Sequence, residues 1–435
     1  MLLYQEHIDA LNAPGKEQRL QALRSLKELH GAGALKSPEP TENVNNHIHT
    51  IYSFSPYSPA KAVYMAWQNG LTTAGIMDHD SIAGAEEFIS AGKIIGIATT
   101  VGFECRCSME GTPLAGRRIN NPDQKSVAYL AMHGIPHQHI GRVDAFLRPY
   151  REKRNARNRK MVQNLNAILS PCGLVLDFAR DILPISCYHQ GGSVTERHIL
   201  YALAGKLEEA AGRGEPLLRF LEERLGITVT GSSREKLADE ANDMYRYYLL
   251  GVLKSRLVER FYVGAAEECP HVTDFLRLAE ETGAVSAYAY LGDVGDSVTG
   301  DKKTQRFEDS YLEELVEYLS AAGFRALTYM PTRNTAGQLR RVMDLCDQHG
   351  LFQISGEDIN SPFQSFVCAA LRQPEFRHLI TATWALIGHE LAATKEQSDG
   401  MFSPETLKKT PGLQQRTAYY SELGRQLAEK EGARI

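Results

Sequence analysis

The chain has 435 residues, of which 43% are hydrophobic and 23% are charged, and its formal net charge is −5. This length exceeds one ordinary domain, so we expect a main domain with additions. The mild negative charge argues against non-specific nucleic-acid binding, which requires a clear basic excess. We expect no membrane segment and no secretory signal, because no apolar run reaches the about 18 residues needed to span a bilayer.

Seven cysteines are scattered along the chain. Their odd number and irregular spacing do not match a disulfide framework, and the Cys105-x-Cys107 pair has no second pair at the spacing of a zinc ribbon. We therefore expect reduced thiols and a cytoplasmic protein.

The first half of the chain begins with a helical segment and continues with alternating strands and helices. Residues 1–35 are predicted to be helical because leucines recur at three-residue steps, and a glycine- and proline-rich stretch ends this segment before residue 40. Strands are predicted over 44–49, 72–77 and 94–101, with helices between them. Such alternation predicts a parallel sheet, either open or closed into a barrel.

The second half contains a helical interruption. Between about 145 and 262 the pattern is helical, and Ser193-Val194-Thr195-Glu196 matches a capping box. Strand–helix alternation then resumes until about residue 355. The predicted organisation is an N-terminal helical extension (1–40), a discontinuous barrel domain (41–145 and 263–362), a helical insertion domain (146–262) and a C-terminal helical extension (363–435).

Potential metal ligands follow several of the predicted strands. His47 and His49 are two residues apart, so on an extended strand both imidazoles face the same side. The segment Asp78-His79-Asp80 follows the second strand, Glu104 follows the third, and Asp358 follows the last. Barrel enzymes gather their catalytic groups at these strand ends. We therefore expect the groups to converge on one site.

The run from His47 to Glu104 resembles the PHP (polymerase and histidinol phosphatase) family, whose motifs are His-x-His-Thr, Asp-His-Asp and Gly-x-Glu. The resemblance covers roughly residues 44–362. The order of the later elements is similar to the branch that contains nucleoside-monophosphate phosphatases and small-RNA 5′ exonucleases. The resemblance implies a distorted (β/α)7-type barrel that binds up to three divalent ions for phosphate-ester hydrolysis.

The chain departs from the family pattern at four positions where the family has metal ligands. An acid is replaced by Phe54, and three histidines are replaced by Ala128, Tyr290 and Asn360. The resemblance therefore implies one Zn, Mn or Fe ion per chain in place of three, held by His47, His49, Glu104 and Asp358.

Further residues receive expected roles beside this ion. His79 is expected to transfer a proton or to orient a phosphate, with Asp78 or Asp80 fixing its tautomer. Arg197 and His198 lie at the predicted start of the helix that follows Thr195, and a helix N-terminus offers free N–H groups to phosphate. The alternative explanation for Arg197 and His198 is an ordinary exposed first turn. The candidate substrate-binding residues are Arg117, Arg118, Arg197, His198, Tyr290 and Asn360.

Three functions are compatible with this sequence. The first is a phosphoesterase that hydrolyses a phosphate monoester or nucleotide, a small phosphorylated substrate, by metal-activated water. The second is a catalytically degenerate scaffold that binds a metal or a small ligand, with Tyr288 and Tyr290 lining an apolar pocket. The third is an RNA 5′ exonuclease, suggested by the basic run over 148–160, for which the commoner explanation is the polar face of a helix.

Overall fold

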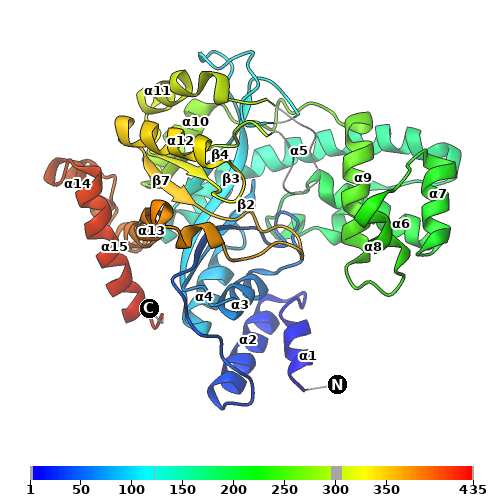
Figure 1. Ribbon diagram of the computed structural model, residues 1–435, viewed down its shortest axis with the longest axis horizontal. Helices are drawn as coiled ribbons and strands as arrows, with labels where there is room; N and C mark the ends of the chain where they lie inside the picture. Colours follow the sequence, from blue (N-terminus) through cyan, green and yellow to red (C-terminus); the bar gives the residue numbers. More distant parts are fainter. Residues whose placement is uncertain (1–2, 122, 295–305, 434–435) are drawn as a thin grey trace.

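The structure is a computed structural model that describes residues 3–121, 123–294 and 306–433. Seven strands form one sheet in chain order. A bridge between Ile48 and Ile359 joins the first strand to the segment after the last, so the sheet is a nearly closed, distorted barrel (Figure 1). The strands are β1 (Val44–Ile48), β2 (Thr73–His79), β3 (Ala98–Ser108), β4 (Val127–His133), β5 (Val285–Ala289), β6 (Ala326–Tyr329) and β7 (Phe352–Ser355).

One strand runs against the rest. β1–β3 are mutually parallel, as are β5–β7, but β4 is antiparallel to both of its neighbours. The expectation of a wholly parallel sheet is therefore wrong at β4. Parallel neighbours need a crossover connection, usually a helix. The described part of the β3–β4 connection contains no helix, so the chain returns beside β3 in the opposite direction.

Helices cover the outside of the barrel. Ser58 begins the first of them by accepting a hydrogen bond from Lys61 N, and Pro59 occupies the first turn, where a missing N–H costs nothing. These helices are α3 (Pro59–Gln68), α4 (Ala85–Ile95), α10 (Val272–Thr282), α11 (Leu312–Ala322) and α12 (Ala336–His349). The outward faces of the strands pack against α10, α11 and α12 in the largest hydrophobic core. The helix α3 packs instead with α4 and the N-terminal helical segment in a separate core.

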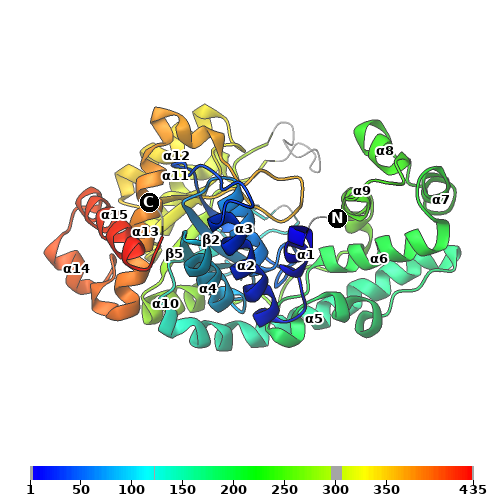
Figure 2. The same ribbon diagram turned by 90° about the horizontal axis from the view of Figure 1, so that it is seen from below.

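The helices between β4 and β5, residues 140–261, form what we call the helical lobe. Its second hydrophobic core consists mainly of leucines. The longest helix runs from the barrel along the whole lobe (Figure 2). The lobe helices are α5 (Ile140–Leu169), α6 (Glu196–Ala211), α7 (Glu215–Leu225), α8 (Gly231–Ala238) and α9 (Tyr245–Phe261).

Helices at both ends of the chain complete the fold. The N-terminal segment forms α1 (Leu3–Ala10) and α2 (Lys16–Gly31), with Pro14 between them, and the C-terminal segment forms α13 (His378–Lys395), α14 (Pro404–Lys409) and α15 (Leu413–Lys430). Small residues of α13 pack against the interior residues of β2 and β4–β7. The helix α13 therefore closes one end of the barrel, and the candidate ligands His47, His49 and Asp358 lie toward the opposite end. Among the described helices, none is both long and apolar enough to cross a membrane.

Candidate metal centre

Five side chains from four parts of the barrel meet at its rim, and we call them the histidine–carboxylate cluster. The carboxylate oxygen Oε1 of Glu104 is their common point. It lies 3.5 Å from His47 Nε2, 3.4 Å from His49 Nε2 and 3.0 Å from His79 Nδ1. Asp358 Oδ1 lies 3.2 Å from His49 Nε2. The structure thus brings together the four ligands and the catalytic histidine that the sequence suggested.

Backbone pairing explains how residues more than 300 positions apart reach the same place. Ile359 exchanges two hydrogen bonds with the His-x-His segment, from His49 N to Ile359 O (2.9 Å) and from Ile359 N to His47 O (3.0 Å). This pairing fixes Asp358 opposite the histidines. It also needs a residue without a side chain at Gly356, where a Cβ would lie 2.6 Å from His47 Cβ.

The ring of His49 is held from behind by a hydroxyl and a carboxylate. Ser53 Oγ donates to Asp78 Oδ1 (2.6 Å) and lies 3.2 Å from His49 Nδ1. Because the Ser53 hydroxyl uses its proton on Asp78, it accepts the proton of His49 Nδ1. His49 Nε2 then carries a lone pair and points into the cluster. Such second-layer contacts orient metal-binding histidines in general.

The ionisation of the cluster follows from burial and proximity. Burial opposes the charged form of Glu104, but the neighbouring His79 and His47 hold the pKa of this carboxyl well below its usual range. Burial also opposes protonation of His47, yet Glu104 and Asp358 raise its pKa. For His49 burial prevails and lowers the pKa, despite the pull of Asp358. The cluster therefore contains ionised carboxylates beside a neutral His49.

These observations fit a divalent cation. His49 is 1% exposed, and in the described structure its Nε2 has no hydrogen-bond partner, although it faces two carboxylate oxygens. A buried lone pair facing carboxylates is unfavourable unless a cation lies between them. His47, His49 and Glu104 each offer a ligand atom within 4.8 Å of the others. Two imidazoles and two carboxylates suit Zn²⁺, Mn²⁺ or Fe²⁺.

Phe54, at the position where the PHP family has an acidic metal ligand, makes aromatic contacts instead. This residue has a positive φ of 88°, an unfavourable conformation for a bulky side chain. Its ring packs into the core of the helical lobe, 5.0 Å from the His198 ring and 5.6 Å from the Tyr201 ring. The side chain that stands at a family ligand position therefore connects the barrel to the lobe.

Two of the positions where the PHP family has a histidine, Ala128 and Tyr290, face the hydrophobic core outside the barrel. Ala128 lies in the outer core, whereas its neighbour Tyr129 has its ring 6.1 Å from that of His79. Tyr288 and Tyr290 also pack in the outer core, and their hydroxyls donate to Glu308 and Asp309. The proposed apolar pocket behind Tyr288 and Tyr290 and the proposed substrate contact of Tyr290 are therefore wrong.

Neither aspartate that flanks His79 holds the His79 ring, so the expected tautomer control is wrong. Asp78 is fully buried and accepts hydrogen bonds from Thr50 N, Thr50 Oγ1 and Ser53 Oγ. Asp80 forms an ion pair with Arg154. The His79 ring instead faces Glu104 through Nδ1.

The candidate substrate-binding residues separate into near and distant groups. Asn360 lies beside the cluster and donates from Nδ2 to Asp358 Oδ1 (2.6 Å). Arg117 forms an exposed ion pair with Glu314 of α11, and Arg118 beside it is exposed. The solvated-loop interpretation therefore describes Arg117 and Arg118 better than phosphate binding does.

The start of α6 also differs from the expectation. The capping residue is Thr195, not Ser193, and its partner is His198, whose Nδ1 accepts from Thr195 N (3.0 Å). Burial lowers the pKa of His198 to about 3. A buried, neutral cap cannot provide positive charge to a phosphate, so that role for His198 is wrong. Arg197 beside it is half-buried near Tyr247.

Several residues near the cluster were missed. Alternation along β3 places Arg106 on the same side as Glu104, because residues two apart share a strand face. His133 ends β4 with 1% exposure, and the charges of His47 and Glu104 act on it. The run over 148–160 is not a solvated face throughout, because Arg151, Arg154 and Arg157 are buried.

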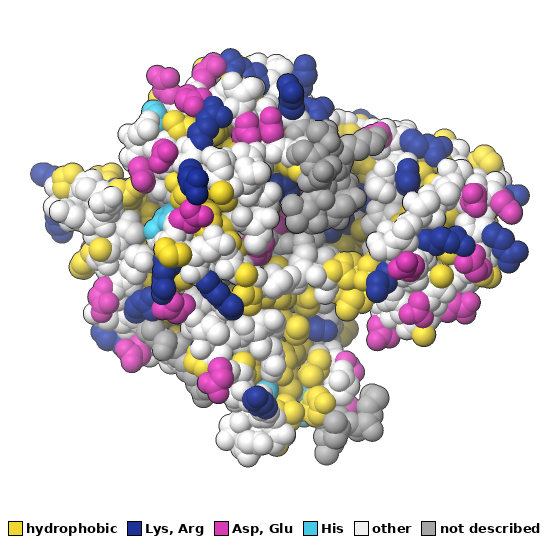
Figure 3. Space-filling model, in the orientation of Figure 1, with side chains coloured by type: hydrophobic (Ala, Val, Ile, Leu, Met, Phe, Trp, Pro, Cys, Tyr) yellow, Lys and Arg dark blue, Asp and Glu magenta, His cyan; other side chains and the backbone are white. Residues whose placement is uncertain are grey.

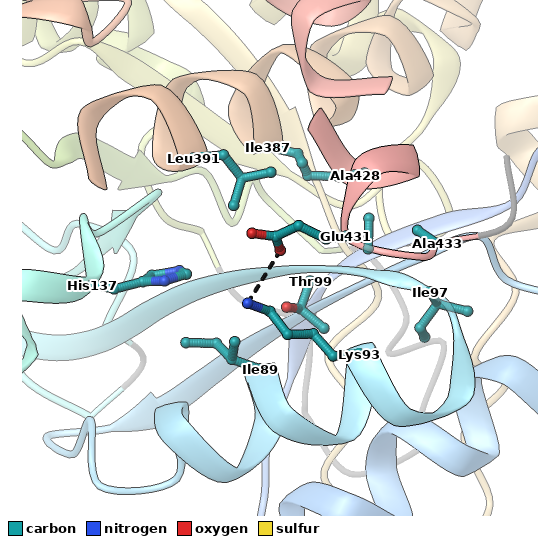
Figure 4. Close-up of a pocket in the computed structure, with 11 residues that line it drawn as sticks. Ile89, Lys93, Ile97, Thr99, His137, Ile387, Leu391, Ala428, Glu431 and Ala433 are labelled. Carbon is teal, nitrogen blue, oxygen red and sulfur yellow. Dashed lines mark ion pairs between the residues drawn. The ribbon is translucent and has the colours of Figure 1, made fainter. Parts of the chain in front are cut away.

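The surface offers two further features. Hydrophobic side chains gather where the barrel meets the helical lobe (Figure 3). Phe363, which follows the last strand of the barrel and is 44% exposed, stacks on Tyr248 of α9 with ring centroids 4.3 Å apart. A small cavity lies elsewhere, among α4, α13 and α15 (Figure 4). Its lining is mainly apolar, and an ion pair between Lys93 and Glu431 crosses it. Its lining includes none of the five cluster residues.

Comparison with known proteins places this fold. No protein-family model matches the chain. Over 92 residues the chain is 34% identical to a 5′–3′ exoribonuclease of Haemophilus influenzae, and the match covers 21% of this chain and 34% of that protein, so the chain spans about a third of this relative. A solved structure from Bifidobacterium adolescentis, provisionally assigned as a metal-dependent phosphoesterase, is 18% identical with a TM-score of 0.50, covering 79% of this chain and 98% of that chain. An amidohydrolase of Chromobacterium violaceum is 17% identical with a TM-score of 0.49, covering 78% and 96%.

The comparison confirms the predicted fold class. The chain is a distorted, nearly closed seven-stranded barrel with helical extensions, and it shares this fold with the solved structure from Bifidobacterium adolescentis. Histidines and carboxylates of the type that bind divalent metals lie together on this barrel. The histidines lie at the ends of β1 and β2, Asp358 follows β7, and Glu104 lies within β3, which continues beyond the position where the sequence predicted its end.

Proposed function

We propose that the protein is a metal-dependent hydrolase that cleaves a small phosphate ester, with one divalent ion bound by His47, His49, Glu104 and Asp358. The observation that carries this proposal is the buried lone pair of His49 Nε2, which lies between Glu104 Oε1 and Asp358 Oδ1. The provisionally assigned phosphoesterase with the same fold supports the same reaction class.

Several residues around the proposed ion have separate roles in the proposed reaction. A divalent ion, when bound, supplies Lewis acidity toward water and phosphate oxygens. Ser53 and Asp78 keep the lone pair of His49 directed at that ion, and Asn360 orients Asp358 by donating to its Oδ1. His79 engages Glu104 through Nδ1, and its side chain is 27% exposed. His79 is therefore placed to exchange a proton with the reacting groups or with solvent.

The test is phosphate release by the purified full chain. The protein would be treated with a chelator, reloaded with Zn²⁺, Mn²⁺ or Fe²⁺, and offered nucleoside monophosphates and other phosphate monoesters. We expect turnover only after reloading, and none by a His49→Ala variant. Stoichiometric metal without turnover of any phosphate ester would instead support a non-catalytic binding protein.

A second candidate function follows from the partial match to an exoribonuclease. In this case the substrate would be a 5′-phosphorylated RNA, and the aromatic pair Phe363–Tyr248 between barrel and lobe offers a surface on which a base could stack. Short 5′-phosphorylated RNA oligonucleotides test this function. Release of mononucleotides from the 5′ end supports it, and release of inorganic phosphate alone supports the monoesterase.

A further inference from the structure

A group of buried cations stands beside the histidine–carboxylate cluster. Arg106 lies on β3 two residues after Glu104, and its partner in the sheet is Tyr129, whose ring is 6.1 Å from that of His79. From the lobe, α5 contributes Arg154 and Arg157. Each of the three arginines is about 5% exposed. Arg106, on the same face of β3 as Glu104, therefore places a positive charge beside the histidine–carboxylate cluster.

The three arginines are matched in charge by carboxylates. Arg154 contacts Asp80 and Glu196, and Glu268 Oε1 lies 2.5 Å from Arg157 Nε and 3.5 Å from Arg106 Nη2. Burial, together with the charges of Arg106 and Arg154, lowers the pKa of Arg157. The guanidinium groups thus repel one another even though carboxylates separate them.

Hydrogen-bond donors in this group lack acceptors. Among the described residues, Arg106 Nη2, Arg154 Nε, Arg157 Nε, Arg157 Nη2 and Asn155 Nδ2 donate no hydrogen bond, although Arg106 and Arg157 keep their ion-pair contacts with Glu268. Two acceptors in the group, Glu268 Oε1 and Asn155 Oδ1, also accept no hydrogen bond. A buried polar group without a hydrogen-bond partner is unfavourable, so several such donors together call for an acceptor. A tetrahedral oxyanion presents several acceptor oxygens, and guanidinium groups bind such oxygens in pairs.

We propose that Arg106, supported by Arg154 and Arg157, binds the phosphate oxygens of the substrate beside the metal-binding cluster. This inference rests on the proposed function and extends it, because the arginines would supply the positive charge that further metal ions would otherwise provide. Phe54 and Tyr129 offer no carboxylate or imidazole for such ions. A fixed guanidinium next to a single cation gives a phosphate two positive contacts.

The experiment measures binding of inorganic phosphate to the full chain by calorimetry, with and without bound metal. The variants are Arg106→Gln, which removes the charge, and Arg106→Lys, which keeps the charge and loses the paired donors. The matched control is Arg142→Gln, on the same helix as Arg154 but exposed and paired with Glu281. Metal content per chain is measured for every variant.

We expect Arg106→Gln to weaken phosphate binding at least tenfold, Arg106→Lys to weaken it less, and Arg142→Gln to leave it unchanged, with equal metal content throughout. Phosphate binding by Arg106→Gln at wild-type affinity would overturn the inference, as would an equal loss in the control or a loss of metal with Arg106. If Arg106→Gln does not fold, Arg106→Lys, which keeps the charge beside Glu268 and Arg157, gives the test, and wild-type phosphate affinity in that variant would overturn the inference. Wild-type protein without metal would refute the proposed function, while its phosphate titrations would still decide the role of Arg106.

Discussion

Substitution of Ser53 by alanine should weaken metal binding without touching a ligand. The hydroxyl of Ser53 lies between His49 Nδ1 and Asp78 Oδ1, at 3.2 and 2.6 Å. Without it, His49 is free to rotate or to move its proton to Nε2, and that tautomer has no lone pair for a cation. Loss of a second-layer partner typically costs 10- to 100-fold in metal affinity, or about 1.4–2.7 kcal/mol.

The assay is competition of the protein with a chelator of known affinity, using chelator-treated protein and one metal at a time. Thermal unfolding of the metal-free protein is measured in parallel, because loss of one hydrogen-bonded pair also lowers stability by about 1 kcal/mol. The control is Ser55→Ala, in the same loop, whose hydroxyl accepts a hydrogen bond from Tyr57 N and, among the described residues, contacts no histidine or carboxylate of the cluster through a hydrogen bond. Equal metal affinity for Ser53→Ala and Ser55→Ala would refute the orienting role.

Three further predictions follow from the same geometry. His49→Ala should lose bound metal and hydrolysis together, whereas His139→Ala, which removes a ring paired with Gln397, should keep both; metal analysis and phosphate release measure this. Gly356→Ala should lower metal affinity and stability, because its Cβ would lie 2.6 Å from His47 Cβ and such overpacking costs about 1–3 kcal/mol; calorimetry and chelator competition measure both. His198 has a pKa lowered to about 3 by burial, below the about 6.5 of an unfolded histidine, so the unfolded chain binds more protons between these values. The stability that neutral His198 contributes is therefore complete above about pH 6.5 and is lost as the pH falls toward 3, and urea unfolding should show a steeper loss for wild type than for His198→Gln, by up to about 1.4 kcal/mol per pH unit.

The convergence of the histidine–carboxylate cluster was predictable because the information for it is local in the sequence. The predicted strand over 44–49 carried both His47 and His49, and Glu104 and Asp358 were expected directly after predicted strands, so the general rule that barrel strand ends converge was sufficient. In the structure Glu104 lies within β3, because this strand continues to Ser108. The strand predicted over 72–77 likewise lies close to the observed strand, Thr73–His79. In both cases periodicity and position along the chain determine the result.

Other features depend on partners distant in sequence. Nothing local shows that Asp78 would face Thr50 and Ser53 while Asp80 would face Arg154. The three-residue steps from Arg151 to Arg157 mark one face of a helix, but only the packed fold shows that this face is buried. Arg106 did carry a usable signal, since alternation from Glu104 places it on the same side of β3.

The central claim is that His47, His49, Glu104 and Asp358 bind one divalent ion. Anomalous diffraction from a crystal of metal-loaded protein, collected at the absorption edge of the ion, tests it most directly. The account predicts one strong peak per chain within bonding distance of His49 Nε2 and Glu104 Oε1. Absence of a peak there, or a peak bound by other residues only, would contradict it.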